Sequence, residues 1–281
     1  MQVIKQLSKM ADFSLKLRRK GRKIGFVPTM GYLHKGHLSL IKQAKSKNDI
    51  VVVSIFVNPT QFGPKEDFKN YPRDFKKDKW LAAAFGVDVI FYPAVKNMYP
   101  AGYCTYVNVE ELTEGLCGAS RPGHFKGVAT VVAKLFNIVQ PDVAYFGQKD
   151  AQQAIVIKQM VKDLNMKVKI EALPTVREKD GLAMSSRNVY LSKSERKDAL
   201  VLYYALNNAK ALIKRGEKNS ARIITAMRKM INAKKTARID YVSMVDAGNL
   251  KDIETIKSKA IIVLAVKIGN TRLIDNMLVG V

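Results

Sequence analysis

The segment His34-Lys35-Gly36-His37 places two histidines on either side of a glycine. It follows an apolar run, 24–27, that predicts a buried strand, and it begins an amphipathic run, 36–47, that predicts a helix. The first turn of a helix offers unpaired N–H groups and partial positive charge, and both favour a bound phosphate. Glycine lets a nucleotide approach the backbone, and histidine can give phosphate oxygens a proton or a hydrogen bond. The segment predicts a phosphate site that His37 faces; two surface histidines beside a loop glycine are the alternative.

The polar segment Pro28-Thr29-Met30-Gly31 directly follows the strand at 24–27 and leads into His34–His37. Three further polar segments follow other predicted strands. They are Asn58-Pro59-Thr60-Gln61, Gly147-Gln148-Lys149-Asp150, and a longer run that begins at Pro174 and ends Met184-Ser185-Ser186-Arg187. Lys149 can neutralise phosphate charge, and Asp150 can accept a hydrogen bond from a ribose. Gln61 and Gln153 are neutral amides that can bind a carboxylate or a hydroxyl. Each of these residues taken alone is more often structural or solvated, so the prediction depends on their shared position after strands.

The elements that would position these segments alternate between strand and helix. We expect strands at 24–27, 50–57, 87–92, 143–146 and 167–173, and helices at 3–17, 36–47, 74–85, 127–139 and 151–164. This alternation predicts a doubly wound parallel sheet of the Rossmann-like α/β class with right-handed crossovers. Ligands bind such sheets beyond the carboxyl ends of the strands, where the strand order reverses. We therefore expect all four polar segments to face one crevice.

The pattern changes past about residue 178. Helices are expected at 192–215 and 220–234, followed by strands at 238–245, 260–267 and 271–278, with the last two joined as a hairpin around Gly269-Asn270. The sequence therefore predicts two domains. Residues 1–178 form the Rossmann-like domain, and residues 179–281 form a smaller α+β domain.

Features that the sequence lacks argue against disulfides, a zinc site, secretion, a membrane span and a covalent enzyme intermediate. Cys104 and Cys117 stand alone, so neither a disulfide framework nor a zinc site is expected. The N-terminus has no secretory apolar core, and the apolar run 260–266 is far shorter than the roughly 20 residues that cross a bilayer. We expect a cytoplasmic protein with no membrane partner. No nucleophile motif or G-x-x-x-x-G-K-[ST] loop occurs, which favours in-line attack on a bound nucleotide over a covalent enzyme intermediate.

The charge is the one unusual feature of the composition. A net charge of +24 and a pI near 9.9 fit a nucleic-acid binder or an enzyme with anionic substrates. The densest cationic cluster, 16–23, has few interleaved aromatic residues. We interpret this cationic cluster as a solvated face of the protein and expect no nucleic-acid partner. Steeply salt-dependent binding of random DNA or RNA would support the nucleic-acid alternative.

These segments together resemble the pantothenate synthetase (pantoate–β-alanine ligase) family of the HxGH nucleotidyltransferase superfamily. The matching stretches are Val27-Pro28-Thr29-Met30-Gly31-Tyr32-Leu33-His34-Lys35-Gly36-His37, Phe56-Val57-Asn58-Pro59-Thr60-Gln61-Phe62, Tyr71-Pro72-Arg73, Arg121-Pro122-Gly123-His124-Phe125-Lys126-Gly127-Val128, Pro141-Asp142-Val143-Ala144-Tyr145-Phe146-Gly147-Gln148-Lys149-Asp150 and Met184-Ser185-Ser186-Arg187-Asn188. His-x-Gly-His alone marks only the superfamily, whereas the whole set is specific to the family.

The resemblance implies a homodimer whose C-terminal domain acts as a lid, and a two-step reaction with Mg²⁺ and ATP. Pantoate attacks the α-phosphorus to give pantoyl adenylate and pyrophosphate; β-alanine then displaces AMP to give pantothenate. It implies catalytic roles for His37, His34 and Lys149. It implies an ATP site of Met30, Gly31, Tyr32, Leu33, His34, Lys35, Gly36, His37, Gly147, Gln148, Lys149, Asp150, Val176, Met184, Ser185, Ser186 and Arg187. Gln61 and Gln153 would hold pantoate, with Gln61 also contacting β-alanine.

No metal-ligating residue is assigned. Asp78 matches an acidic position that the family has near the metal and phosphates, but Lys76 and Lys77 beside it depart from the family's more acidic run. A second enzymatic interpretation stays open, a nucleotidyltransferase that keeps the nucleotide in its product. Two amide-bearing strand ends and the C-terminal lid argue against it. Release of AMP and pyrophosphate, rather than a dinucleotide, would decide between the two.

Overall fold

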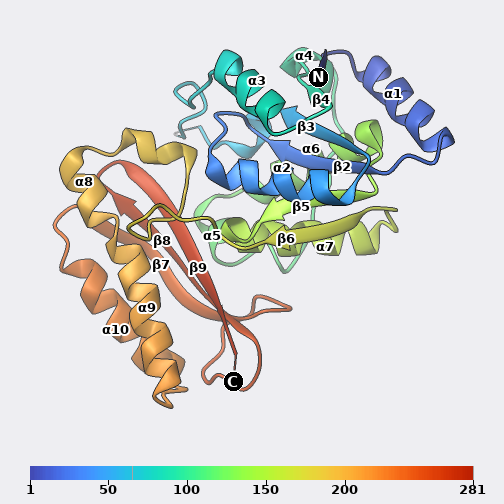
Figure 1. The fold of residues 1–281 in the computed structure, drawn as a ribbon. Helices are drawn as coiled ribbons and strands as arrows, with labels where there is room; N and C mark the ends of the chain where they lie inside the picture. Colours follow the sequence, from blue (N-terminus) through green and yellow to red (C-terminus); the bar gives the residue numbers. More distant parts are fainter. Residues whose placement is uncertain (65, 281) are drawn as a thin grey trace.

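Two separate sheets organise the chain (Figure 1). The structure is a computed structural model that describes residues 1–64 and 66–280. A six-stranded sheet is built from the first part of the chain, and a three-stranded sheet with its helices from the last part. Among the described residues, no helix is both long and apolar enough to span a membrane.

The six-stranded sheet is parallel throughout. Its strands are β1 (Gln2–Ile4), β2 (Ile24–Thr29), β3 (Ile50–Ile55), β4 (Val89–Phe91), β5 (Val143–Gly147) and β6 (Lys169–Leu173). Their order is β1-β4-β3-β2-β5-β6, so the direction of winding reverses between β2 and β5. The predicted doubly wound α/β fold is confirmed, and its switch point lies where the His34–His37 and Gly147–Asp150 segments begin.

Helices cover both faces of this sheet. They are α1 (Leu7–Arg19), α2 (Lys35–Lys47), α3 (Phe75–Ala84), α4 (Val95–Met98), α5 (Cys117–Ser120), α6 (His124–Val139) and α7 (Ala151–Asp163), with short 3₁₀ turns η1 (Pro59–Gln61) and η2 (Gln148–Asp150). Alternate residues of β2 point to opposite faces. Phe26 packs into a core with Phe136 of α6, and Val27 packs into a second core with Ile41 of α2. Burial on both sides explains why these strands are almost continuously apolar.

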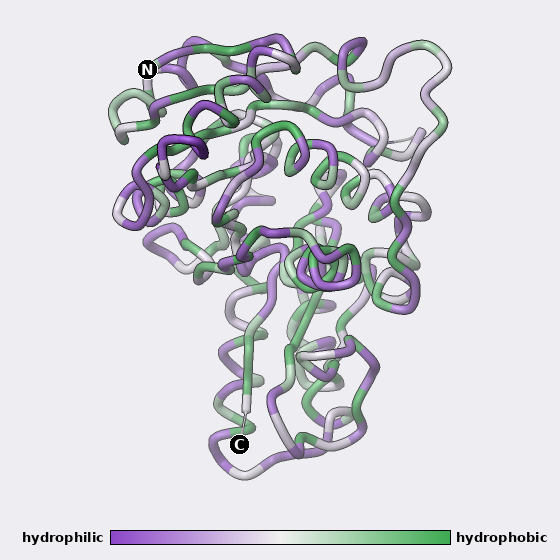
Figure 2. The backbone as a smooth tube through the Cα atoms, turned by 90° about the vertical axis from the view of Figure 1, so that its right-hand side faces the viewer, coloured by the Kyte–Doolittle hydropathy of each residue, from purple (hydrophilic) through white to green (hydrophobic). Residues whose placement is uncertain are grey.

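The C-terminal part packs helices on a meander of antiparallel strands. Its elements are η3 (Ser186–Tyr190), α8 (Lys193–Asp198), α9 (Val201–Lys214), α10 (Ser220–Asn232), β7 (Ala237–Asp246), β8 (Ala260–Ile268) and β9 (Thr271–Val279). Leu206 of α9, Met227 of α10 and Leu264 of β8 share one core. Figure 2 shows the apolar runs of this part as green stretches in the narrower, lower half of the molecule. The predicted hairpin joins β8 to β9 at Gly269, whose φ of 56° suits glycine.

Three expected elements differ most from those observed. Gln2–Ile4 does not extend the first helix but forms strand β1, because it pairs with β4 at residues 89–91. The single helix expected at 192–215 is divided, since the N–H of Leu202 bonds the carbonyl of Ala199, three residues back, and breaks the α-helical ladder. Helix α6 begins at His124 rather than at 127, directly after Gly123 in the left-handed conformation.

Candidate active site

A cavity of about 830 Å³ lies beyond the carboxyl ends of the central parallel strands, with residues of β9 on its opposite wall. All four polar segments identified in the sequence contribute to it. The site residues predicted from the sequence that line it are Met30, His34, Gly36, His37, Gln61, Gly147, Lys149, Asp150, Gln153, Val176, Met184, Ser185, Ser186 and Arg187. The fold therefore brings together segments that are up to about 150 residues apart, as expected from the reversal of strand order.

Five predicted nucleotide residues, Gly31, Tyr32, Leu33, Lys35 and Gln148, do not line the cavity. The loop that contains the first three is held from behind by Asp78, whose carboxylate accepts hydrogen bonds from the N–H groups of Tyr32 at 2.8 Å and Leu33 at 2.6 Å. Asp78 is 1% exposed, so its carboxylate supports this loop instead of facing the cavity. The loop is tight here: a Cβ on Gly31 would lie 2.9 Å from Asp78 Oδ2.

The two histidines cap the N-terminus of α2 reciprocally. His34 Nδ1 accepts a hydrogen bond from the N–H of Gly36 at 3.1 Å, and His37 Nδ1 accepts one from the N–H of His34 at 3.3 Å. A neutral imidazole that accepts at Nδ1 carries its proton on Nε2. Both rings, with centroids 4.0 Å apart, are therefore prepared to donate Nε2–H to a ligand.

Electrostatics keep these two rings neutral. Burial, followed by the charge of Lys149, lowers the pKa of His34 to about 4. Burial, followed by the neighbouring His34, lowers the pKa of His37 well below its ordinary value. The sequence left open whether His37 offers a proton or a hydrogen bond. The geometry and the lowered pKa favour a hydrogen-bond donor.

The lowered pKa of His34 makes folding stability depend on pH. Between its ordinary value near 6.5 and about 4, the unfolded chain binds a proton at His34 that the folded chain does not, so stability falls as pH falls through this window. We expect the free energy of unfolding to drop by roughly 1–2 kcal/mol from pH 7 to pH 5 through this group. His34→Asn keeps a capping acceptor without titrating. Urea unfolding at both pH values should show a smaller loss in the variant, and equal losses would contradict the assignment.

Lys149 is positioned by a residue from the other sheet. Asn276 of β9, 5% exposed, donates from Nδ2 to the carbonyl oxygens of Gln148 and Lys149, both at 2.8 Å. The Lys149 side chain lies 3.8 Å from the Asp150 carboxylate. Asn276 was not predicted from the sequence, because nothing in its local pattern links it to a loop 127 residues earlier. Its contacts fix the backbone that carries the only lysine among the predicted catalytic residues.

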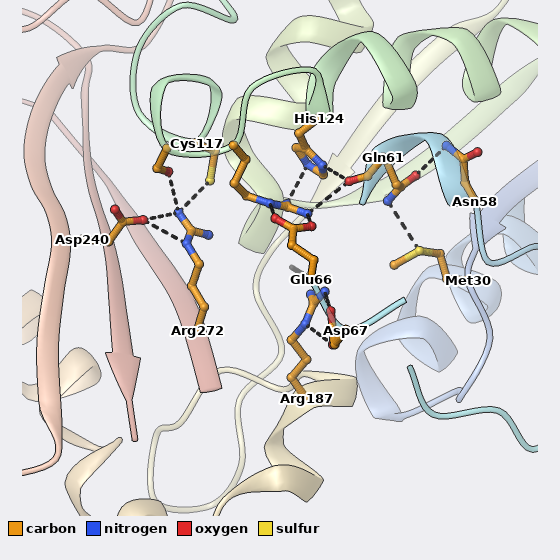
Figure 3. Close-up of polar contacts among 12 residues, drawn as sticks. Met30, Asn58, Gln61, Glu66, Asp67, Cys117, His124, Arg187, Asp240 and Arg272 are labelled. Atoms are coloured by element: carbon orange, nitrogen blue, oxygen red, sulfur yellow. Dashed lines mark hydrogen bonds and ion pairs between the residues drawn. The ribbon is translucent and has the colours of Figure 1, made fainter. Parts of the chain in front are cut away.

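A second link between the two sheets involves Arg272 of β9. Its guanidinium is 2.7 Å from Asp240 and 3.2 Å from Ser120, and it contacts Cys117 Sγ at 3.5 Å (Figure 3). Cys104 and Cys117 are both free. These contacts join β7 and β9 to α5, and residues of the three-stranded sheet form one wall of the cavity.

Gln61 lies on η1 with its amide directed toward Met30. Its Oε1 accepts a hydrogen bond from Asn58 Nδ2 at 3.1 Å, and its Nε2 is 3.4 Å from Met30 Sδ (Figure 3). Gln153 lines the same cavity. Its neighbour Gln152 is structural, since it is 7% exposed and bonds three backbone groups of the 112–117 region.

Arg187 lines the cavity and is already paired. Its guanidinium forms two hydrogen bonds with the carboxylate of Asp67, at 2.9 and 2.8 Å (Figure 3). Other acidic residues of the cavity are paired in the same way: Glu66 with Arg121, Asp240 with Arg272, and Asp275 with Arg177. Within the described ranges, no group of three or more His, Cys, Asp or Glu side chains is arranged to hold a metal ion.

Comparison with known families decides the relationship. The family model described as pantoate-beta-alanine ligase matches residues 2–278. The chain belongs to this family. A pantothenate synthetase of Moorella thermoacetica is 58% identical over 281 residues, which cover 100% of this chain and 99% of that protein. A pantothenate synthetase of Caldicellulosiruptor saccharolyticus is also 58% identical, with 100% of both chains covered.

Solved structures of the family share the whole fold. Pantothenate synthetase from Thermus thermophilus superposes with a TM-score of 0.94 at 46% identity, covering 99% of each chain. The pantoate-beta-alanine ligase of Francisella tularensis, complexed with beta-gamma ATP and beta-alanine, superposes with a TM-score of 0.81 at 39% identity over 99% of this chain and 97% of that one. The family resemblance inferred from the sequence motifs is therefore confirmed.

Proposed function

We propose that this pantoate–β-alanine ligase family member condenses (R)-pantoate with β-alanine to form pantothenate, AMP and pyrophosphate. One observation carries the proposal beyond family membership. The same cavity holds a pair of neutral histidine donors at a helix N-terminus, the cation of Lys149, and the neutral amides of Gln61 and Gln153. The first set suits a triphosphate, and the amides suit a hydroxy acid whose carboxylate must stay nucleophilic.

In the proposed first step, a carboxylate oxygen of pantoate attacks the α-phosphorus of ATP. A P–O bond to pyrophosphate breaks as the new P–O bond forms, and pantoyl adenylate results. Charge grows on the phosphate oxygens in this step, where pre-organised donors stabilise it most. We assign that stabilisation to the Nε2–H of His37, with His34 and Lys149 beside it.

In the second step, the amine of β-alanine attacks the acyl carbonyl of the adenylate. The C–O bond to AMP breaks, the amide forms, and one proton leaves the nitrogen. Gln61 is proposed to contact both pantoate and β-alanine, and Gln153 to hold pantoate. The Francisella tularensis relative is complexed with beta-gamma ATP and beta-alanine, which supports ATP and β-alanine as ligands of this chain.

The remaining predicted nucleotide residues keep their proposed roles. They are Met30 to Lys35 with Gly36 in the loop and first turn of α2, Gly147 to Asp150 at η2, and Val176 with Met184 to Arg187 on the segment that follows β6. We further propose a division into residues 1–178 and a lid of residues 179–281, of which residue 281 lies outside the described part. A cytoplasmic location is also proposed, since the free cysteines fit a reducing compartment, and a homodimer is proposed from the resemblance alone.

Mg²⁺ is proposed to arrive with ATP. Mg²⁺ is commonly held by substrate phosphates and one or two carboxylates. Most acidic side chains of this cavity are occupied by arginines, so the residues fit an ion carried mainly by the triphosphate better than a separate protein cage. When bound, the ion would neutralise phosphate charge; the chain's own contribution is the donors described above.

The decisive experiment is incubation with Mg-ATP, pantoate and β-alanine, omitting each in turn, with identification of all products. We expect AMP and pyrophosphate, and pyrophosphate–ATP exchange with pantoate alone. Carboxylate-¹⁸O pantoate should give AMP that carries one label. A dinucleotide product would favour the rival nucleotidyltransferase, whereas unlabelled AMP would exclude the adenylate route.

The Asp67–Arg187 pair predicts a gain of ATP affinity on mutation. If Arg187 binds phosphate, ATP must displace the Asp67 carboxylate from it. A partly exposed pair of this kind is worth up to about 1 kcal/mol. Asp67→Asn should therefore lower the ATP Kd by roughly threefold to fivefold, measured by calorimetry with a non-hydrolysable analogue. Arg187→Ala, alone and in the double variant, is the control: if Asp67→Asn still tightens binding without Arg187, the competition does not exist.

A further inference from the structure

The main chain of Gln61 is held by two side chains that the sequence did not assign to the site. Its carbonyl oxygen lies 2.8 Å from His124 Nδ1 and 3.2 Å from Arg121 Nη2. His124 is the first residue of α6 and Arg121 follows α5 directly, three residues earlier; Figure 3 shows the His124 ring directed at the Gln61 backbone. The substrate-facing glutamine is therefore fixed from behind by residues about 60 positions later in the chain.

The hydrogen-bonding pattern determines the tautomer of His124. A carbonyl oxygen only accepts, so His124 Nδ1 must carry the proton that it donates to Gln61. Nε2 is then an acceptor, and it receives the Nη1–H of Arg121 at 3.0 Å. Burial, followed by the charge of Arg121, lowers the pKa of His124 to about 4, so the ring stays neutral and the direction of both bonds is kept.

Glu66 completes the chain of contacts. Its two carboxylate oxygens accept hydrogen bonds from Arg121 Nε and Nη2, each at 2.6 Å. This fork-to-fork geometry fixes the plane of the guanidinium and leaves Nη1 for His124. The order Glu66–Arg121–His124–Gln61 is thus a continuous hydrogen-bonded series that ends on a backbone carbonyl.

The rest of η1 has little room to move. Asn58 binds the side-chain oxygen of Gln61 at 3.1 Å and the carbonyl of Gly127 at 3.1 Å. A Cβ on Gly127 would overlap the carbonyl of Thr60, so α6 and η1 are in direct backbone contact. What remains directed at the cavity is the amide nitrogen of Gln61, whose protein contact is the weak acceptor Met30 Sδ at 3.4 Å.

We propose that Glu66, Arg121 and His124 are positioning residues that hold the backbone of Gln61 so that its amide N–H groups meet pantoate. The proposal rests on the proposed function and deepens it. Arg121 and His124 also line the cavity, so direct contact with substrate is the competing explanation. The two explanations differ in whether the residues act through Gln61.

The test compares His124→Ala, His124→Asn and His124→Gln in steady-state pyrophosphate release with Mg-ATP, pantoate and saturating β-alanine. The amide nitrogen of asparagine can take the place of Nδ1, whereas that of glutamine resembles Nε2. We expect the alanine and glutamine variants to raise the pantoate KM by roughly tenfold, as for the loss of one buried hydrogen bond. The asparagine variant should stay within about threefold, and the ATP KM should change by less than about twofold in all three.

The double variant separates positioning from direct contact. If His124 acts through Gln61, adding His124→Ala to Gln61→Ala leaves the pantoate KM where Gln61→Ala alone puts it. The proposal would be overturned if the effects of His124→Ala and Gln61→Ala on the pantoate KM multiplied in the double variant. It would also be overturned if His124→Asn raised the pantoate KM as much as His124→Ala while the two variants were equally stable. If His124→Ala does not fold, Glu66→Gln takes its place in the test. We expect Glu66→Gln to raise the pantoate KM by less, and this rise should also be absent when Gln61 is already alanine. Wild-type protein that does not turn over pantoate would instead refute the proposed function.

Discussion

Replacing His37 by alanine is expected to lower the rate of adenylate formation by roughly 100- to 1,000-fold. The expectation follows from the position of His37, which lies in the first turn of α2 and lines the cavity. Its Nδ1 already accepts a hydrogen bond from the N–H of His34. Only Nε2–H is then left for the α-phosphate. Loss of one pre-organised donor to developing charge costs about this much. Pyrophosphate release in a single turnover measures it directly.

Two amide variants make this prediction specific to the donor. His37→Gln can place an amide nitrogen near the Nε2 position, whereas His37→Asn reaches only the Nδ1 position. We expect the glutamine variant to be at least about tenfold faster than the asparagine variant, which should be as slow as alanine. Equal rates for the two amides, or an alanine variant within about twofold of wild type, would remove the Nε2–H donor from the mechanism.

Loss of Lys149 should have an effect of similar size. Lys149→Ala is expected to lower kcat/KM for ATP by roughly 100- to 1,000-fold, because the variant leaves the triphosphate without its proposed cation. The side chain is only 19% exposed, so solvent screens it little. The matched control is Lys158→Ala, which removes an exposed lysine of α7, the helix that follows η2. A general effect of net charge would slow both variants, and a site-specific effect slows only the first.

The sheet and the cavity were predictable because their signals are local and repeated. Each central strand is apolar on both faces, as in 50–57, and polar residues follow each strand end. Once the sheet is parallel, its topology alone brings His37, Gln61 and Lys149 to one edge. The family resemblance added the chemistry, and the site roles taken from it stay predictions.

What the sequence could not predict depends on contacts between distant segments. Strand β1 exists because residues 2–4 find an open edge at β4, and the apolar spacing around Val3 fits a helix equally well. Asn276 looks like any polar residue of a strand until its amide is seen to bind the η2 carbonyls. The hydrogen-bonded series from Glu66 to His124 is only partly visible in the sequence, as an arginine three residues before a histidine at a helix start. Its target on Gln61 has no signal in the sequence.

The dependence of Lys149 on Asn276 has a consequence for how the enzyme is made. Domains generally fold from the N-terminus as the ribosome delivers them, and all six parallel strands are synthesised well before β9. Until β9 emerges, the η2 loop lacks the amide that fixes its carbonyls. A nucleotide stabilises only a form that can bind it. We therefore expect ATP to stabilise the completed chain more than a nascent chain that still lacks β9.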